Sequence, residues 1–245
     1  MKIISWNVNS VRARIENLLE VLPKEDPDVV LLQETKVKDE LFPYEFFEDF
    51  GYNIAVRGEK IKTGRNGVAI FSKHVLEDVK IDFDEEARYI EAYTGGAFVA
   101  SVYVPNGQEI GALAYLYKLN FLERLKLKFS EYKNEIFVVG GDFNVAPYQN
   151  DTYIEGYSDI MASQEERKLI SDLREIGYRD ALADKGYTWW DYRRSGFQKD
   201  NGFRLDQFYL SPKATELFLD GEVIRYARGL QRPSDHAPIE CEIKI

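Results

Sequence analysis

Two continuous apolar runs limit what this chain can fold into more than any other feature of its sequence. Val29–Gln33 and Ile136–Gly140 show no alternation of apolar and polar side chains, and each leads within two residues to an acid. Strands of this kind are covered on both faces. Phe98–Val104 instead lies in a tract of consecutive strands with short turns, as in an antiparallel meander. The sequence therefore predicts an α/β fold with two packed mixed β-sheets flanked by helices.

The other periodic segments complete this arrangement. Short β-branched or aromatic runs predict strands, and apolar residues repeated at three and four predict helices. Ser163-x-x-Glu166 is a capping box that opens one helix, and Pro23 is expected to stop another. The predicted strands are Lys2–Trp6, Val29–Gln33, Tyr52–Val56, Gly67–Phe71, Val79–Phe83, Tyr89–Tyr93, Phe98–Val104, Ile136–Gly140, Leu205–Leu210, Glu222–Arg225 and Ile239–Ile243. The predicted helices are Arg14–Leu22, Leu113–Phe129 (apolar at Leu116, Leu119, Leu122, Leu125 and Phe129), Ser163–Ile176 and Pro212–Leu219.

The chain has 245 residues and no Gly/Ser- or Pro-rich linker, so we expect one domain over residues 1–245. Its first residues lack the pattern of a signal peptide, and no apolar run approaches the roughly 18 residues that span a bilayer. Cys241 is the only cysteine, which excludes an intrachain disulfide. These features indicate a cytoplasmic protein with no membrane partner.

The formal net charge of −10 argues against a partner held by a broad positive field. A nucleic-acid partner is still consistent with this charge, because local clusters of basic residues matter more than the net charge of the chain. Solvated surface is an equally good explanation for such clusters when they lie in loops or at element ends. The clusters are Arg12/Arg14, Lys60/Lys62/Arg65 and Arg193/Arg194.

Acidic and amide side chains follow several of the predicted strands. In Val138–Asn144 a buried strand reaches two glycines, which allow a tight turn, and then Asp142 and Asn144. Positions i and i+2 of an extended chain point the same way, so both side chains can converge on one reacting atom. An ordinary Asx turn explains this pattern equally well.

Glu34 directly follows Val29–Gln33, where an unpartnered carboxylate would be costly. A hard divalent cation such as Mg²⁺ is one suitable partner, and Lys36 is another. Asn7 and Asn9 end the first predicted strand in a similar way, although carboxamides at such positions commonly serve turns.

One of the two histidines, His236, precedes the last predicted strand, a position where a histidine taken alone is more often a surface or capping residue. Asp206 lies in a strand-like stretch, where it would orient the imidazole of His236 and favour the charged ring. Tyr103 ends another strand with a phenol able to bond a phosphate, although a packed tyrosine before an ordinary turn explains it equally well.

The chain lacks P-loop, zinc-binding, nucleophile-elbow and dinucleotide-binding motifs. Its acids, amides, phenol and imidazole suit metal-assisted hydrolysis by an activated water. In that interpretation Glu34 holds the metal, Asp142 orients or deprotonates the water, and His236 stabilises the developing oxyanion.

Eight motifs make the chain resemble the exonuclease III group of AP endonucleases, within the endonuclease/exonuclease/phosphatase superfamily. They run nearly end to end in the order of that family, which makes the resemblance specific. It implies a four-layer, DNase I-like α/β sandwich with one metal-dependent site at the strand ends. The motifs are Trp6–Arg14, Leu32–Lys36, Asn66–Ile70, Tyr103–Gly107, Gly141–Asn144, Trp189–Arg193, Arg204–Asp206 and Ser234–Pro238.

The resemblance implies a base excision repair enzyme that hydrolyses duplex DNA 5′ to abasic sites and leaves a 3′-hydroxyl. It also implies 3′-phosphodiesterase or 3′→5′ exonuclease activity and a Mg²⁺ cofactor, with Mn²⁺ as a substitute. The implied metal shell is Glu34 with Asn7, Asn9 and Asp235. The implied catalytic residues are Tyr103, Asp142, Asn144, Asp206 and His236.

Contacts to DNA are implied for a further set of residues, three of which would form a small apolar pocket for the extruded abasic sugar. The pocket residues are Trp189, Phe203 and Leu205, and the other contacts are Arg12, Arg65, Arg88, Asn106 and Arg193. Extruding a nucleotide from the duplex costs least where it carries no base that could pair or stack, so a tight pocket adds selectivity for abasic sites. We expect a monomer that associates with the nucleoid when it acts on DNA.

The chain departs from the family pattern at two neighbouring positions. Asn9 stands where some relatives carry Asp, so one carboxylate is missing near the metal, and Ser10 replaces a more common Gly. Short loops after Gly107 and over Pro147–Ser163 leave the balance of endonuclease and exonuclease activity open.

Two other functions are consistent with parts of the sequence. One is a phosphatase of inositol phosphates or sphingolipids, or an RNA deadenylase, which would share the Asp-x-Asn and Ser-Asp-His elements but not Trp189–Arg193. The other is a non-catalytic DNA-binding or scaffold protein, which the retention of every polar site residue disfavours.

Overall fold

The computed structural model describes residues 1–58 and 64–245 of the chain, with the backbone alone at position 194. Within these residues the strands form two six-stranded sheets, which confirms the predicted fold class. The first sheet has the order β11-β12-β1-β2-β4-β3, and the second has the order β5-β6-β7-β8-β10-β9.

The first sheet contains β1 (Lys2–Asn7), β2 (Val29–Gln33), β3 (Asn53–Arg57), β4 (Val68–Ser72), β11 (Phe218–Val223) and β12 (Ile239–Ile243). The second contains β5 (Glu77–Lys80), β6 (Tyr89–Thr94), β7 (Ala97–Tyr103), β8 (Phe137–Asp142), β9 (Arg179–Asp180) and β10 (Asp206–Leu210). The α-helices are α1 (Ile15–Glu25), α2 (Leu113–Glu131), α3 (Gln164–Glu175) and α4 (Pro212–Glu216).

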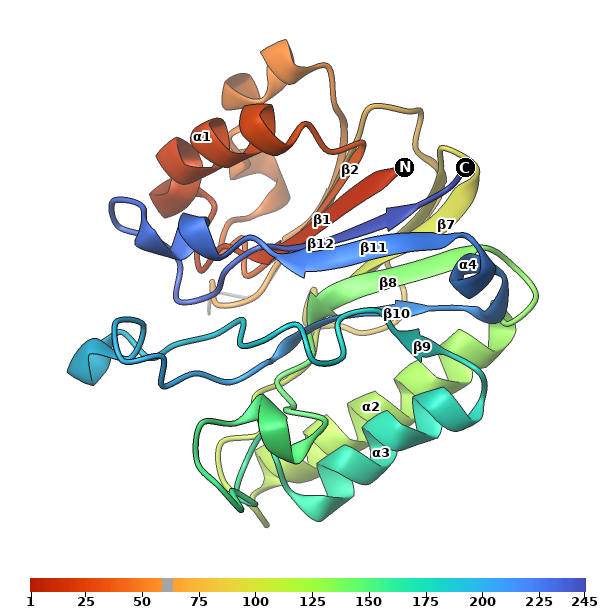
Figure 1. The fold of residues 1–245 in the computed structure, drawn as a ribbon. Coiled ribbons are helices and arrows are strands. Elements are labelled where there is room, and N and C mark those ends of the chain that lie inside the picture. The colour runs from red at the N-terminus through yellow and green to blue at the C-terminus, as the bar shows by residue number, and fades with distance from the viewer. Residues whose placement is uncertain (59–63) are drawn as a thin grey trace.

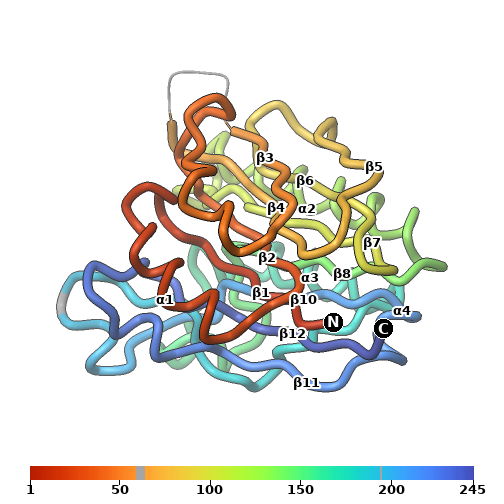
Figure 2. Tube along the Cα trace, turned by 90° about the horizontal axis from the view of Figure 1, so that it is seen from above, coloured from red at the N-terminus to blue at the C-terminus, as the bar shows by residue number. Residues whose placement is uncertain are grey.

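The elements stack in four layers, which Figure 1 shows from the side, and Figure 2 shows the same chain trace from above. Helix α1 covers the outer face of the first sheet, and α2 and α3 cover the outer face of the second. An apolar core between the sheets includes Leu31, Ile70, Val99 and Phe208, all of which are fully buried. Because each sheet is covered on both faces, its central strands must be apolar throughout.

Parallel pairs occupy the centre of each sheet. β1 pairs with β2 and β7 pairs with β8 in parallel, while the remaining pairings are antiparallel. The carboxyl ends of β1, β2, β7 and β8 therefore lie at one edge of the sandwich, where the polar residues that follow them meet. The two termini lie close together at the opposite end, where Met1 and Ile243 exchange main-chain hydrogen bonds (Figure 1).

Several local predictions are wrong. Helix α1 continues through Pro23 to Glu25, although this proline cannot donate to the carbonyl of Leu19 and its ring crowds that carbonyl. The helix ends at Asp26, a left-handed residue whose N–H bonds to the carbonyl of Leu22. The short strand β9 was not predicted, and β5 covers Glu77–Lys80 instead of Val79–Phe83. Strand β11 begins at Phe218, within the predicted helix Pro212–Leu219, instead of covering Glu222–Arg225.

The two glycines before Asp142 lie inside β8 and make no turn. They are required for a different reason. A Cβ on Gly141 would collide with the carbonyl oxygen of Val102, and one on Gly140 would meet the ring of Phe208. Close approach of neighbouring strands therefore explains both residues.

The predicted apolar stripe of α2 is also partly wrong. Leu116 is 55% exposed, whereas Lys118 is fully buried beside Phe121 and Leu122. None of the helices in the described ranges is both long enough and apolar enough to cross a membrane.

Candidate functional site

The polar residues that follow the central strands meet at one edge of the sandwich. Asn7 ends β1, Glu34 follows β2 and Asp142 ends β8. Asp206 begins β10, directly opposite Asp142 in register, and His236 precedes β12. Both sheets therefore contribute side chains to one site, as the sequence predicts.

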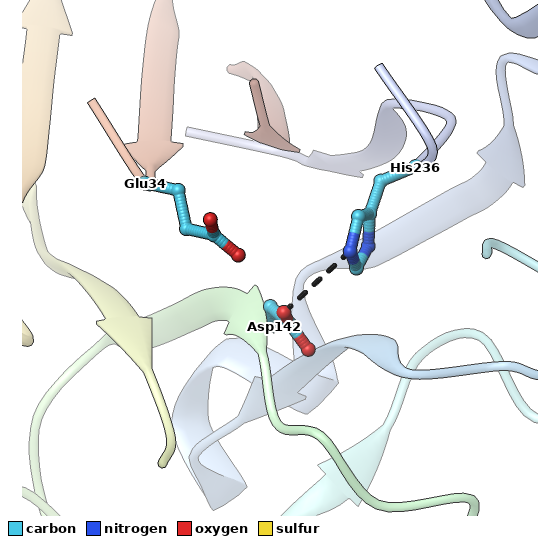
Figure 3. A group of neighbouring side chains, drawn as sticks. All are labelled: Glu34, Asp142 and His236. Carbon is cyan, nitrogen blue, oxygen red and sulfur yellow. Dashed lines mark ion pairs between the residues drawn. The ribbon is translucent and has the colours of Figure 1, made fainter. Parts of the chain in front are cut away.

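Glu34, Asp142 and His236 point toward one another, as Figure 3 shows. Their ligand atoms all lie within 4.8 Å of one another, so the group can hold a metal ion. The Nδ2 of Asn7 donates to Glu34 Oε1 at 2.8 Å and to Asp142 Oδ2 at 2.9 Å. One buried amide thus fixes the two carboxylates relative to each other.

His236 is held by Asp206. Its Nδ1 lies 2.8 Å from Asp206 Oδ2, and its Nε2 lies 3.7 Å from Asp142 Oδ2. Burial alone would lower the pKa of the imidazole, but the charges of Asp206 and Asp142 outweigh it and raise that pKa to about 10. The ring is therefore a cation at neutral pH, with its Nε2 facing the site.

Asp142 is buried, and this desolvation raises the pKa of its carboxyl to about 7, against the opposing charge of His236. A base poised near neutral pH is suited to taking a proton from water. The Oδ1 of Asp142 accepts the main-chain N–H of Asn144 at 2.9 Å, and Oδ2 lies 3.3 Å from Asn144 Nδ2. The predicted convergence of these two side chains is present, but Asn144 has φ +50° and is not extended.

Asp235 lies in a second polar group beside this one. Its Oδ1 accepts from Asn9 Nδ2 at 2.9 Å, and its Oδ2 accepts from Trp189 Nε1 at 3.0 Å. Burial would raise the pKa of this carboxyl, but the charge of His236 and the two hydrogen bonds lower it. Asp235 is therefore an anion next to the imidazolium.

Lys36 connects the two groups. Its Nζ lies 2.7 Å from Glu34 Oε2 and 2.6 Å from Asn9 Oδ1. The sequence offered this lysine only as an alternative partner for Glu34, and the contact with Asn9 was not predicted.

Left-handed backbone is concentrated around these side chains. Non-glycine residues with positive φ are rare and cluster at functional sites. Glu34 has φ +51°, Asn9 has φ +45° and Ser10 has φ +89°. Asn7 also stabilises the turn that follows it, since its Oδ1 accepts the N–H of Asn9 at 3.0 Å.

Tyr103 ends β7 beside the site. Its phenol has a pKa well above the ordinary value because of burial and the charges of Glu34 and Asp142, so it stays a neutral donor.

Arg88 lies over the Tyr103 ring at 4.8 Å and pairs with Glu86 at 2.7 Å. Asn106 Nδ2 lies 3.2 Å from Asn144 Oδ1, so both predicted phosphate contacts border the site.

An apolar cluster lies next to the polar site. Trp189, Phe203 and Leu205 pack together in it with Ala146 and Ala162. The rings of Trp189 and Phe203 are 5.8 Å apart, and both line a cavity of about 430 Å³. The structure thus brings together the three residues predicted to form the sugar pocket.

The predicted basic contacts lie on the surface. Arg12 is exposed in a 3₁₀ turn just after Ser10, and Arg65 is exposed just before Asn66, whose carbonyl accepts the N–H of Lys36. Arg193 is exposed and paired with Asp191 at 2.7 Å. Lys60 and Lys62 lie outside the described residues.

Comparisons with known proteins identify the family of this chain. The profile of the endonuclease/exonuclease/phosphatase family matches residues 4–236. Exodeoxyribonuclease III of Haemophilus influenzae is 32% identical over the full length of both chains. An AP endonuclease from Archaeoglobus fulgidus has a TM-score of 0.93 at 32% identity, with both chains fully covered.

A 3′ phosphatase, NExo from Neisseria, was solved with a product DNA hairpin. It has a TM-score of 0.93 at 33% identity, again over the whole of both chains. The matched span includes every residue of the polar site described above. The chain therefore belongs to the endonuclease/exonuclease/phosphatase family, and within it to the exodeoxyribonuclease III group of nucleases.

Proposed function

We propose that this chain is a Mg²⁺-dependent DNA repair phosphodiesterase that cleaves duplex DNA on the 5′ side of abasic sites. We further propose that it removes blocking groups or nucleotides from 3′ ends. The single observation that carries the proposal is the convergence of Glu34, Asp142 and His236 within 4.8 Å, joined by Asn7. This group of side chains contains a candidate base, a cation and a metal ligand, as phosphodiester hydrolysis requires.

The donor set fits a hard divalent cation. Glu34 and Asp142 offer carboxylate oxygens, no cysteine lies nearby, and His236 has its Nδ1 engaged by Asp206. Such oxygen-rich sites suit Mg²⁺ or Mn²⁺. We assign Glu34 as the principal ligand, with Asn7, Asn9 and Asp235 near the ion and its waters. When bound, the ion supplies Lewis-acid stabilisation of charge on the phosphate.

The residues of the chain can carry out the hydrolysis as follows. Asp142 accepts a proton from a water whose oxygen attacks phosphorus, and Asn144 helps to orient that water. The P–O3′ bond breaks, so O3′ leaves and, after protonation, becomes the 3′-hydroxyl of the upstream strand. His236 bonds a non-bridging phosphate oxygen as a cation, while Tyr103 and Asn106 bond the phosphate as neutral donors.

The apolar cluster supports selection of abasic sites. Trp189, Phe203 and Leu205 pack into one apolar cluster, and Trp189 joins it to Asp235 of the polar site, an arrangement that suits a deoxyribose without a base. Arg12, Arg65 and Arg193 are exposed near the same edge and would neutralise backbone phosphates. We therefore propose duplex DNA as the partner, and we keep the expectation of a monomer that acts at the nucleoid in the cytoplasm.

Removal of 3′ groups is the second activity we propose, because the Neisseria relative is described as a 3′ phosphatase. The same attack on phosphorus would release inorganic phosphate from a 3′-phosphate end. Which activity dominates depends on whether the pocket accepts an internal abasic sugar.

A labelled duplex with one abasic analogue tests the proposal. We expect a cut directly 5′ to the analogue with Mg²⁺ and none with EDTA. Asp142→Asn should lower the turnover by about 10³-fold, within the range for loss of a general base, while DNA binding is retained. An intact strand in the presence of metal, under conditions where an authentic AP endonuclease cuts it, would contradict the assignment.

Two parallel substrates separate the alternatives. A duplex with a recessed 3′-phosphate reports the 3′ activity, and soluble phosphodiesters such as a lipid headgroup report a phosphatase of small molecules. Preference for the headgroup over both DNA substrates would contradict a DNA repair function.

A further inference from the structure

A buried ion pair lies directly beneath the catalytic edge and has no place in the mechanism above. Lys118 of α2 and Glu166 of α3 are both 0% exposed, and the Nζ of Lys118 pairs with Glu166 Oε1. The same ammonium donates to the carbonyl of Asn144 at 2.7 Å and to the carbonyl of Asn106 at 3.1 Å. Within the described part of the chain, the ammonium thus bonds the partner carboxylate and two loops of the site.

A buried ion pair between two helices carries a large desolvation cost. Desolvation of a buried ammonium and carboxylate can exceed their mutual attraction, so apolar residues of similar volume often stabilise a fold equally well. Burial lowers the pKa of Lys118, against the opposing effect of Glu166, which is a sign of that penalty. Helix packing alone does not explain why charges occupy this position.

The two carbonyls that Lys118 holds belong to residues next to the reacting groups. Asn144 has a left-handed φ of +50°, and its N–H and side chain contact Asp142. The side chain of Asn106 in turn bonds Asn144. A strained turn persists only when its surroundings fix it, and the ammonium supplies that fixation from below.

Glu166 extends the connection to the apolar cluster. Its Oε1 also accepts the N–H of Met161 at 3.2 Å, and its Oε2 accepts from the N–H and hydroxyl of Ser163 at 2.9 and 2.7 Å. Met161 packs against the cluster that contains Phe203, and its carbonyl accepts the N–H of Ala146 at 2.6 Å. One carboxylate thus touches the ammonium under the phosphate site and the backbone of the pocket wall.

We propose that Lys118 and Glu166 are positioning residues. They fix the Asp142–Asn144 turn and the Asn106 loop relative to the wall of the sugar pocket. Neither residue touches the reacting atoms. The inference rests on the proposed hydrolysis at this site. The ion pair fixes the geometry of the turn, so loss of the ion pair should lower kcat and leave DNA affinity nearly unchanged.

A neutral double variant separates positioning from stability. Lys118→Met alone leaves Glu166 buried without its partner, which should destabilise the fold strongly. Lys118→Met combined with Glu166→Gln removes both charges; the amide oxygen still accepts from Ser163, while the Met161 N–H loses its acceptor. We expect the double variant to recover most of the lost thermal stability, while kcat stays at least tenfold below wild type and KM changes by less than threefold.

Glu91→Gln is the matched control. Glu91 is a carboxylate of 1% exposure in β6 that accepts from the hydroxyls of Tyr89 and Tyr132 and pairs with Lys128, among residues with no role in the site. Its loss should lower stability and leave kcat at the wild-type value. Recovery of kcat together with stability in the double variant would overturn the proposal.

Hydrogen exchange gives a readout that needs no turnover. The Asn144 amide bonds Asp142 Oδ1, so a loosened turn exposes it. In the double variant this amide should exchange at least tenfold faster than in Glu91→Gln at matched stability, and equal rates would contradict the inference. If wild type cuts neither DNA substrate, the proposed function fails, whereas a cutting wild type with an equally active double variant defeats only the positioning role.

Discussion

The indole Nε1 of Trp189 lies 3.0 Å from Oδ2 of Asp235, so a wall of the apolar cluster is hydrogen-bonded to the second polar group of the site. The other oxygen of Asp235 is occupied by Asn9. Trp189 therefore has two separable functions. Its ring lines the pocket, and its N–H orients an anion next to His236.

Replacing Trp189 with Phe should separate these functions. The ring surface is largely kept, but the N–H that bonds Asp235 is lost. We expect the free energy of unfolding to fall by about 1.5–3 kcal/mol, as for a hydrogen bond to a charged group. The Mg²⁺ concentration for half-maximal cutting should rise about tenfold, as for loss of a partner that orients a metal ligand. Urea unfolding and a metal titration of the cutting rate measure the two effects.

Trp190→Phe is the matched control for this experiment. Trp190 is fully buried, and its Nε1 bonds Asp200 Oδ1, also at 3.0 Å, a carboxylate that is not among the residues assigned to the metal. This variant should lose stability without any change in Mg²⁺ dependence. An equal shift in both variants would show that Trp189 acts only through the stability of the fold.

Asp206→Asn should lower the pKa of His236. The folded pKa of about 10 lies above the ordinary value of about 6.5, so the folded state binds this proton more tightly. The resulting stability is fully present below about pH 6.5 and is lost as the pH rises toward 10. The gap in unfolding free energy between wild type and Asp206→Asn should therefore be larger at pH 6 than at pH 10.

The pKa itself can be measured by NMR in metal-free protein. The chain has two histidines, so His74→Gln leaves His236 as the one imidazole signal. We expect this signal to titrate near pH 10 with Asp206 present and at lower pH in Asp206→Asn. An identical titration in both proteins would mean that Asp206 does not hold the charge of the ring.

Much of the fold could be predicted because burial leaves a plain signal in the sequence. Val29–Gln33 and Ile239–Ile243 were predicted with their observed bounds, since each strand lies within a covered sheet. The capping box of Ser163 and Glu166 was also predicted correctly. Pro23 was misinterpreted because a local rule cannot tell the last turn of a helix from the residue after it.

The site was predictable where residues follow strands, because parallel strands bring their carboxyl ends together. Lys118 was not, because a lysine on a helix is normally solvated and its burial depends on Glu166 of another helix. The hydrogen bond between Trp189 and Asp235 likewise joins residues 46 positions apart. Contacts of this kind depend on tertiary packing, which spacing in one sequence does not encode.

Asn9→Asp should strengthen metal binding. Asn9 bridges Lys36 and Asp235, donating to the latter at 2.9 Å. A carboxylate at position 9 keeps the lysine contact, loses the donor and adds negative charge beside Asp235. Without metal the variant should be less stable than wild type, and the rise in melting temperature on adding Mg²⁺ should be larger. The Mg²⁺ concentration for half-maximal cutting should fall several-fold.

Asn9→Ala controls for the loss of the two hydrogen bonds. It should be destabilised without gaining affinity for Mg²⁺. If Asn9→Asp needs more Mg²⁺ than wild type, position 9 does not face the ion.

Ser10→Gly should stabilise the protein. Ser10 has φ +89°, a conformation that costs a residue with a Cβ about 1–3 kcal/mol, and its N–H bonds the carbonyl of Glu34 at 2.7 Å. Glycine removes that strain but adds about 0.5–1 kcal/mol of backbone freedom to the unfolded chain. We therefore expect a net gain of about 0.5–2 kcal/mol in the free energy of unfolding, measured in urea. Ser10→Ala keeps the Cβ and should show no gain, so an equal gain in both variants would rule out backbone strain as the cause.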